Sequence, residues 1–120
     1  MNHNDFSFAN LHLHSYNSDG TFRPMHLPRL AKSLGYGAVA LTDHETLSGL
    51  PEFLAEAKEC EIEAITGVEI FARLESAGDT IFHLTGLDFD PTHPAIVDFT
   101  DMLVQKRNEN TRAIFEVALD

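Results

Sequence analysis

The segment spanning residues 38–42 constrains the fold more than any other, because it is apolar through Leu41 and runs directly into Asp43 and His44. A strand without a polar face is typical of a sheet that is covered on both sides, as in parallel α/β folds. Apolar residues at helical spacing precede and follow it, over residues 27–34 and 50–57. The sequence therefore predicts an α/β fold built on a parallel sheet.

Strand and helix patterns alternate along the rest of the chain. Gly35 and Gly37 are expected to end the first helix, and Ser48 is expected to be the N-cap of the second. The expected elements, in chain order, are a strand that includes residues 10–14, a helix opened by Pro24 or Pro28, a strand over 38–42, a helix that follows Ser48, a strand over 62–74, a hairpin or tight crossover at Ser76, Gly78 and Asp79, a strand over 80–87, and a long helix capped by Thr92 or His93.

The length and composition fit one globular domain. Of the 120 residues, 43% are hydrophobic and 9% aromatic, which excludes a disordered or fibrous chain. No run approaches the roughly 20 apolar residues of a transmembrane helix, and the N-terminus lacks the basic region and apolar core of a signal peptide, so a cytoplasmic location is expected. The single cysteine, Cys60, has no partner for an internal disulfide, and we expect it to be a small, partly buried residue near a helix end.

The charge balance narrows the range of partners. Eight basic side chains against 19 acidic ones give a formal net charge of −11. Such a chain has no electrostatic attraction of its own for duplex nucleic acid or for an anionic membrane. Two or three bound divalent cations would add about +4 to +6 in one cleft, which lets an acidic protein bind a phosphate at its metals.

The stretch over residues 10–15 provides two imidazoles with the spacing of metal ligands. In an extended strand, His12 and His14 point to one face while the leucines beside them point to the other. Asp19, followed by Gly20, places a carboxylate in a turn that can fold back towards the histidines. We interpret this stretch as half of a metal site.

Further candidate ligands follow at the ends of later strands. In strand-and-helix barrels the carboxyl ends of the strands gather on one face, where active sites form. Alone, His44 or His83 is as consistent with a core histidine as with a ligand, but the ordered combination favours a metal site. Six nitrogen and oxygen ligands are too many for one tetrahedral zinc ion and suit two or three ions about 3.5 to 4 Å apart, of manganese, zinc or iron, with Glu69 as a bridging carboxylate. The candidate metal ligands are His12, His14, Asp19, His44, Glu69 and His83.

Five short motifs carry a resemblance to a known family. They resemble, in order and spacing, the N-terminal motifs of the PHP (polymerase and histidinol phosphatase) family of metal-dependent phosphoesterases. Residues 90–94 and 106–108 are similar to the branch that contains 3′,5′-nucleotide bisphosphate phosphatase and the RNA-end exonuclease RNase AM. The resemblance implies the N-terminal part of a distorted (β/α) barrel over residues 1–90, and a long helix over 91–120 that opens an inserted helical region. The motifs are His-Leu-His at 12–14, Ser-Asp-Gly at 18–20, Thr-Asp-His at 42–44, Gly-Val-Glu at 67–69 and His-Leu-Thr-Gly at 83–86.

The resemblance also implies how the ligands are grouped. His12, His14 and Glu69 would hold one metal, Glu69 would bridge to a second metal bound by His83, and Asp19 with His44 would belong to a third. The family pattern adds another histidine and a late Asp-x-His pair, which have no counterpart in these 120 residues, so this chain would supply the cluster in part. The implied reaction is hydrolysis of a phosphate monoester of a nucleotide or short RNA end by a metal-bound hydroxide, without a protein nucleophile.

Residues around the candidate ligands receive supporting roles. Asp43 is interpreted as a partner that orients a ligand histidine. Ser15 and Ser18 lie near the site in sequence, and turn formation is their better interpretation. Arg107 and Arg112 are candidates for contact with a substrate phosphate, although a solvated helix face with carboxylate partners is the commoner role for such arginines.

Two alternatives stay open from the sequence. Another PHP phosphatase, such as a histidinol-phosphate phosphatase, shares the motifs, although residues 90–94 and the helix after them argue mildly against it. A non-catalytic, metal-binding fragment is the alternative outside catalysis. Half a barrel leaves a sheet edge and an apolar helix stripe uncovered, which predicts self-association of such a fragment as a homo-oligomer.

Overall fold

The computed structural model describes residues 8–78 and 80–119, so that the expected turn residue Asp79 lies outside the described residues. None of the helices in this part of the chain is long and apolar enough to cross a membrane. The elements, in chain order, are β1 (Phe8–Leu13), η1 (Pro24–His26), α1 (Leu27–Ser33), β2 (Tyr36–Leu41), α2 (Leu50–Glu59), β3 (Glu63–Leu74), η2 (Glu75–Ala77), β4 (Thr80–Leu87) and α3 (Pro94–Leu119).

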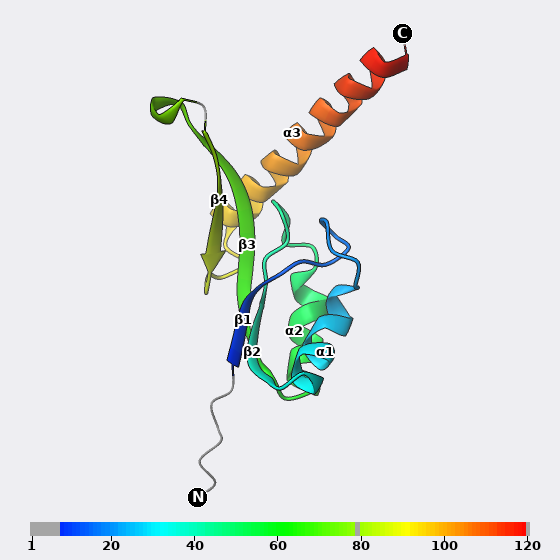
Figure 1. The fold of residues 1–120 in the computed structure, drawn as a ribbon, viewed down its shortest axis with the longest axis vertical. Helices are drawn as coiled ribbons and strands as arrows, with labels where there is room; N and C mark the ends of the chain where they lie inside the picture. Colours follow the sequence, from blue (N-terminus) through cyan, green and yellow to red (C-terminus); the bar gives the residue numbers. More distant parts are fainter. Residues whose placement is uncertain (1–7, 79, 120) are drawn as a thin grey trace, which may run out of the picture.

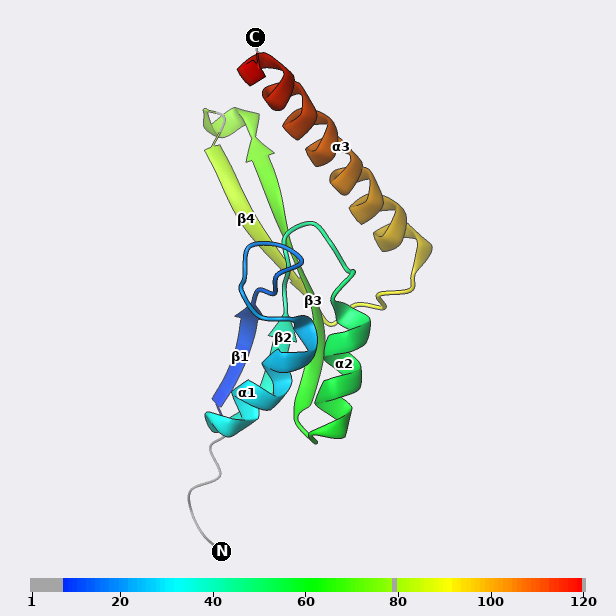
Figure 2. The ribbon, with the colours of Figure 1, turned by 90° about the vertical axis from the view of Figure 1, so that its right-hand side faces the viewer.

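The four strands form one mixed sheet in the order β1-β2-β3-β4. β1 pairs with β2 and β2 with β3 in parallel, whereas β3 and β4 form an antiparallel hairpin. The sheet is curled into a half-barrel, with α1 and α2 on one side of β1 to β3, and α3 extends as a long helix on the β3 side of the β3–β4 hairpin, away from β4 (Figures 1 and 2). The predicted α/β fold is confirmed, and of the hairpin and the crossover the chain forms the hairpin.

The core lies between the sheet and the two short helices. Three successive β2 residues, Val39, Ala40 and Leu41, are buried, as expected of a strand covered on both faces. Phe53 of α2 is fully buried against them, and Cys60 is buried at the C-terminal end of the same helix, as the sequence predicts. The residues of the core cluster are Leu27, Ala31, Val39, Leu41, Leu50, Phe53, Ala57, Cys60 and Ile62.

The start of α2 differs from the sequence prediction. The N-cap is Gly49, and Ser48 instead accepts hydrogen bonds from Asn17 and Thr46, both at 3.0 Å. Pro51 follows at the start of the helix and has no N–H group, so a side-chain cap has one donor fewer to satisfy. Gly49 also lies close to β2, because a Cβ atom there would be 2.9 Å from Leu41 Cδ2.

The ends of two other helices also bear on the predictions. Gly35, with φ of 89°, follows α1 as expected. The prediction that Gly37 also ends this helix is wrong, because Gly37 lies within β2. His93 precedes α3, and its Nδ1 atom accepts a hydrogen bond from the backbone N–H of Ala95 at 3.2 Å. Of the two expected capping residues, Thr92 and His93, it is therefore His93 that caps the long helix.

Replacing Phe53 with alanine tests the packing of the core. Because the ring is fully buried among β2 and α1 residues, we expect the free energy of unfolding in urea to fall by about 3–5 kcal/mol. Phe115, which is exposed on α3, provides the matched control, and its replacement with alanine should change that free energy by less than about 0.5 kcal/mol. Equal effects of the two substitutions would contradict this packing.

Candidate metal centre

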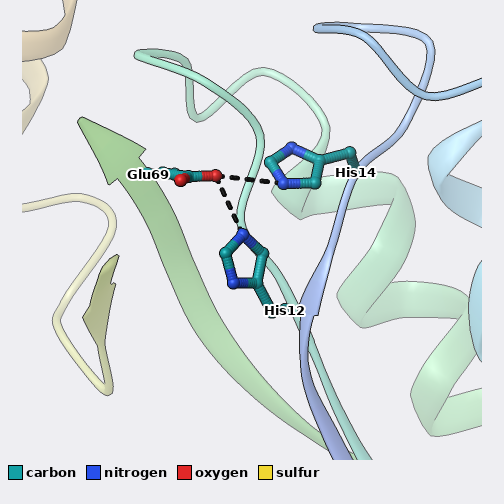
Figure 3. Close-up of side chains that lie close together, drawn as sticks. All are labelled: His12, His14 and Glu69. Carbon is teal, nitrogen blue, oxygen red and sulfur yellow. Dashed lines mark hydrogen bonds and ion pairs between the residues drawn. The ribbon is translucent and has the colours of Figure 1, made fainter. Parts of the chain in front are cut away.

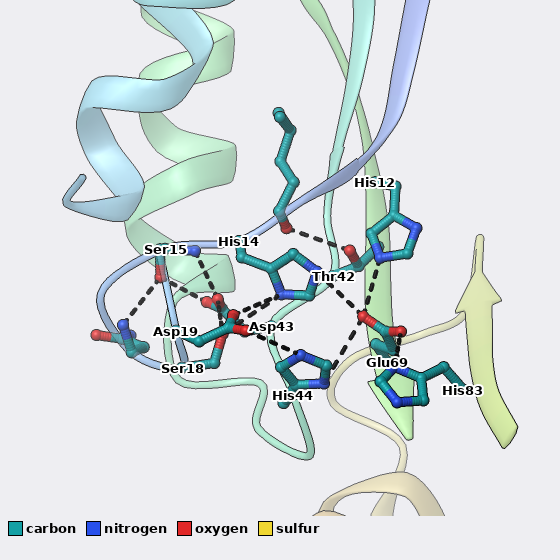
Figure 4. Close-up of polar contacts among 12 residues, drawn as sticks. His12, His14, Ser15, Ser18, Asp19, Thr42, Asp43, His44, Glu69 and His83 are labelled. Atoms are coloured by element: carbon teal, nitrogen blue, oxygen red, sulfur yellow. Dashed lines mark hydrogen bonds and ion pairs between the residues drawn. The ribbon is translucent and has the colours of Figure 1, made fainter. Parts of the chain in front are cut away.

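The candidate ligands converge at one end of the sheet. His12 lies in β1, His14 and Asp19 follow that strand, and His44 follows β2. The C-terminal ends of parallel strands meet at the same edge, and the hairpin partner β4 brings His83 to β3. Figure 4 shows the side chains grouped around Glu69 of β3.

Glu69 lies at the centre of the group. Its side chain is 3% exposed, and its Oε2 atom is 2.9 Å from His12 Nε2 and 3.0 Å from His14 Nε2 (Figure 3). The same oxygen is 3.6 Å from His44 Nδ1, and the other oxygen, Oε1, is 2.8 Å from His83 Nδ1. One carboxylate therefore faces four imidazoles from three separate parts of the chain: the end of β1, the segment after β2, and β4.

Asp19 provides a second carboxylate on the solvent side of the cluster. Its Oδ1 atom is 3.3 Å from His14 Nδ1, and its Oδ2 atom is 3.3 Å from His44 Nε2. Both imidazoles therefore use one ring nitrogen towards Asp19 and the other towards Glu69. The loop can turn back in this way because residue 20 is glycine: a Cβ atom there would lie 2.2 Å from the carbonyl oxygen of His14.

The surroundings of Glu69 favour its ionised form. Burial raises the pKa of its carboxyl group, but hydrogen bonds with His12 and His83 and the nearby charge of His44 outweigh burial, so the pKa lies below its ordinary value. Glu69 is therefore a carboxylate at neutral pH, which is the form that binds a metal ion.

The donor geometry fits divalent cations. Three groups of residues each have ligand atoms within 4.8 Å of one another. Glu69, His14 and His44 each belong to two of the three groups. In addition, His44 Nδ1 is buried and has no hydrogen-bond partner among the described residues, which is the condition of a nitrogen available to a metal. Metal binding itself stays a prediction. The groups are His12–His14–Glu69, His14–Asp19–His44 and His44–Glu69–His83.

Asp43 supports the loop that carries the first ligands. Its buried carboxylate accepts hydrogen bonds from the Ser15 N–H and Oγ, both at 2.6 Å, and from Ser18 Oγ at 2.7 Å. These bonds fix the turn between His14 and Asp19, and the orientation of a ligand histidine by Asp43 stays a prediction. The serines were expected only to form a turn, and the sequence gives no sign of their pairing with an aspartate 28 and 25 positions away.

The two candidate arginines of α3 lie in different surroundings. Arg107 Nη1 donates to the carbonyl oxygen of His44 at 3.2 Å and lies 3.8 Å from Glu45 Oε2. Arg112 lies farther along α3 and is exposed. Arg107 thus touches the segment that carries a candidate ligand and has the carboxylate partner expected of a surface arginine, while phosphate contact stays a prediction for both residues.

The Asp43→Asn substitution tests the support of the loop. The amide keeps the size of the side chain but replaces one acceptor oxygen with a donor, so that buried serine groups lose their acceptor. We expect the free energy of unfolding to fall by about 1–3 kcal/mol, and exchange of the Gly20 amide hydrogen, which bonds to the Ser15 carbonyl oxygen, to become faster. The exposed Asp101→Asn on α3 is the control, and the same loss of stability in both variants would refute this role.

Comparison with known proteins gives a consistent assignment. A model of the PHP domain family matches residues 10–116. The 5′-3′ exoribonuclease of Haemophilus influenzae is 43% identical over 100 residues, which cover 81% of this chain and 35% of that protein. The 3′,5′-nucleoside bisphosphate phosphatase of Chromobacterium violaceum is 34% identical over 102 residues, which cover 85% of this chain and 35% of that protein.

Solved structures share the fold. An amidohydrolase from Chromobacterium violaceum, with bound sulfate and no metal, superposes with a TM-score of 0.80 at 33% identity, covering 92% of this chain and 39% of that one. A protein from Bifidobacterium adolescentis, assigned as a metal-dependent phosphoesterase, superposes with a TM-score of 0.84 at 28% identity, covering 96% of this chain and 40% of that one. This chain thus spans about a third of the length of the curated relatives. Since the family model covers most of its residues, the chain belongs to the PHP domain family.

Proposed function

We propose that this chain supplies metal ligands to a phosphoesterase that hydrolyses a phosphate monoester of a nucleotide, either a 3′,5′-bisphosphate or the end of a short RNA. The observation that carries this proposal is the convergence of three overlapping ligand groups, two of which contain Glu69. Similarity to an exoribonuclease and to a nucleoside bisphosphate phosphatase supports the nucleotide substrate.

The proposed ligands divide between two or three ions. His12, His14 and Glu69 would hold one ion, Glu69 and His83 would contribute to a second, and Asp19 with His44 would contribute to a third. In the structure, His44 also lies with the second group and His14 with the third. Bound divalent cations would activate water as the nucleophile and neutralise charge on the phosphate oxygens. Nitrogen and oxygen donors without a thiolate suit manganese, zinc or iron.

The protein groups prepare this site in three ways. The ionised Glu69 sets a negative charge in a buried position, where its attraction for a cation is strong. His12, His83 and Asp19 remain partly open to solvent, so a phosphate can approach from their side. Ser15 and Ser18 donate their hydroxyl hydrogens to Asp43, which holds the turn that carries His14 and Asp19.

Two alternative functions can be distinguished by experiment from the proposed nucleotide phosphoesterase. A histidinol-phosphate phosphatase would have the same ligands and prefer an amino-alcohol phosphate to a nucleotide. A non-catalytic metal-binding fragment is the alternative outside catalysis, and the chain spans about a third of the length of its curated relatives. It would bind metal and release no phosphate from either substrate.

Metal content is the direct test of the ligand cluster. Elemental analysis of protein purified without chelator should give two or more transition-metal ions per chain, because three ligand groups are present. Glu69→Gln removes the shared charge and should lower that number. Glu63→Gln changes an exposed residue of the same strand and should leave the metal content unchanged, and absence of metal from the wild type would refute the proposed cluster.

Phosphate release tests the reaction. With manganese present, the chain should release phosphate from a nucleotide 3′,5′-bisphosphate faster than from histidinol phosphate. His14→Ala should reduce release to the metal-free background, because His14 belongs to two ligand groups. His26→Ala, on the exposed η1 turn, is the matched control and should retain activity. Metal binding without phosphate release from either substrate would favour the non-catalytic alternative.

A further inference from the structure

We infer that Phe71, a residue outside the candidate ligand set, positions the imidazole rings of His44 and His83 for metal binding. This inference rests on the proposed metal-dependent function. Phe71 lies in β3 two residues after Glu69 and, by strand alternation, on the same face of the sheet. It also lies directly opposite His83 in the antiparallel register of β3 and β4. The hairpin therefore presents the carboxylate, the phenyl ring and one imidazole together.

The ring of Phe71 contacts both histidines. It stacks nearly parallel on His44, with centroids 4.7 Å apart and an angle of 12° between the ring planes. It meets His83 edge-on, at 4.5 Å and 83°. His44 in turn stacks on His14 at 4.6 Å and 27°. The ring of His44 is thus enclosed between His14 and Phe71, and loss of the phenyl ring would free one whole face of it.

His44 has few other restraints on its ring. Its Nδ1 atom has no hydrogen-bond partner among the described residues, and its nearest carboxylate contacts are 3.6 Å to Glu69 and 3.3 Å to Asp19. Most metal-bound histidines are oriented by a hydrogen bond to the nitrogen that does not bind the ion. The Nδ1 atom of His44 lacks such a bond among the described residues, and the stack on Phe71 adds a restraint on the plane of the ring that the two carboxylate contacts do not provide.

The contacts of Phe71 with the histidines account for a phenylalanine at this position better than packing in the core does. The side chain is 42% exposed, so it contributes little to the buried core. Phe82, on the neighbouring strand β4, is also 42% exposed but alternates to the other face from His83. Phe82 is therefore a control of matched chemistry, exposure and hairpin location.

The test compares Phe71→Leu with Phe82→Leu and Phe71→Tyr by two measurements. In metal-free protein, NOEs between the ring protons of His44 and His14, which stack at 4.6 Å, report the orientation of the His44 ring independently of the ring current of residue 71. Phe71→Leu should weaken these NOEs, whereas Phe71→Tyr and Phe82→Leu should leave them unchanged. In manganese titrations, Phe71→Leu should bind the metal about 10- to 100-fold more weakly than wild type, and the other two variants should bind as wild type does.

The outcomes separate this inference from the proposed function. Unaltered His44–His14 NOEs in Phe71→Leu, or manganese binding as tight as that of wild type, would overturn the positioning role. A wild-type chain that binds no manganese would refute the proposed function, and the NMR comparison would then decide the role of Phe71 without metal. Wild-type results for Phe71→Tyr in both measurements, together with altered results for Phe71→Leu, would establish that an aromatic ring at position 71 orients the histidine.

Discussion

The pairing of β2 with β3 continues past the end of β2, and the candidate site depends on this continuation. His44 forms a parallel bridge with Glu69, the Glu69 N–H donates to the Asp43 carbonyl oxygen at 3.2 Å, and the Glu45 N–H donates to the Glu69 carbonyl oxygen at 2.8 Å. The chain then turns at Glu45 with φ of 56°, a conformation that is unfavourable for a residue with a side chain. The two backbone bonds hold the turn and fix His44 beside Glu69.

The buried carboxylate of Glu69 would be costly in isolation. An ionised group removed from water needs hydrogen bonds and opposite charge, and here the imidazoles of His12, His14 and His83 lie within 3.0 Å of its oxygens. The same nitrogen atoms are candidate donors to a cation. The polar contacts that satisfy the Glu69 carboxylate are therefore the ones that an ion would replace, so binding would require an exchange of partners rather than a rearrangement of the backbone.

The sequence predicts the strands, helices and candidate ligands of this site better than the tertiary contacts that hold the ligands in place. Helical and strand periodicity locate the elements, and the His-x-His and Thr-Asp-His motifs place imidazoles at strand ends, because these signals are local. The N-cap of α2 is Gly49 and not Ser48. Gly49 lies close to Leu41, and such a tertiary contact cannot be seen in the local sequence pattern. The bonds from Asp43 to the serines are equally non-local. Phe71 carried a usable signal, its two-residue spacing from Glu69, but an aromatic residue in a strand is ordinarily read as core.

The charge of the chain shapes how it could recognise a phosphate. The net charge is −11, and the arginine nearest the cluster, Arg107, is already engaged by the His44 carbonyl oxygen and lies near Glu45. The cluster itself contains two carboxylates, Asp19 and Glu69, so two or three divalent cations would change its local charge from about −2 to about +2 or +4. Attraction for a phosphate would then come from the bound ions, and the acidic surface around them would oppose long polyanions that extend beyond the cluster. A small nucleotide or a single RNA end suits this distribution of charge better than a duplex does.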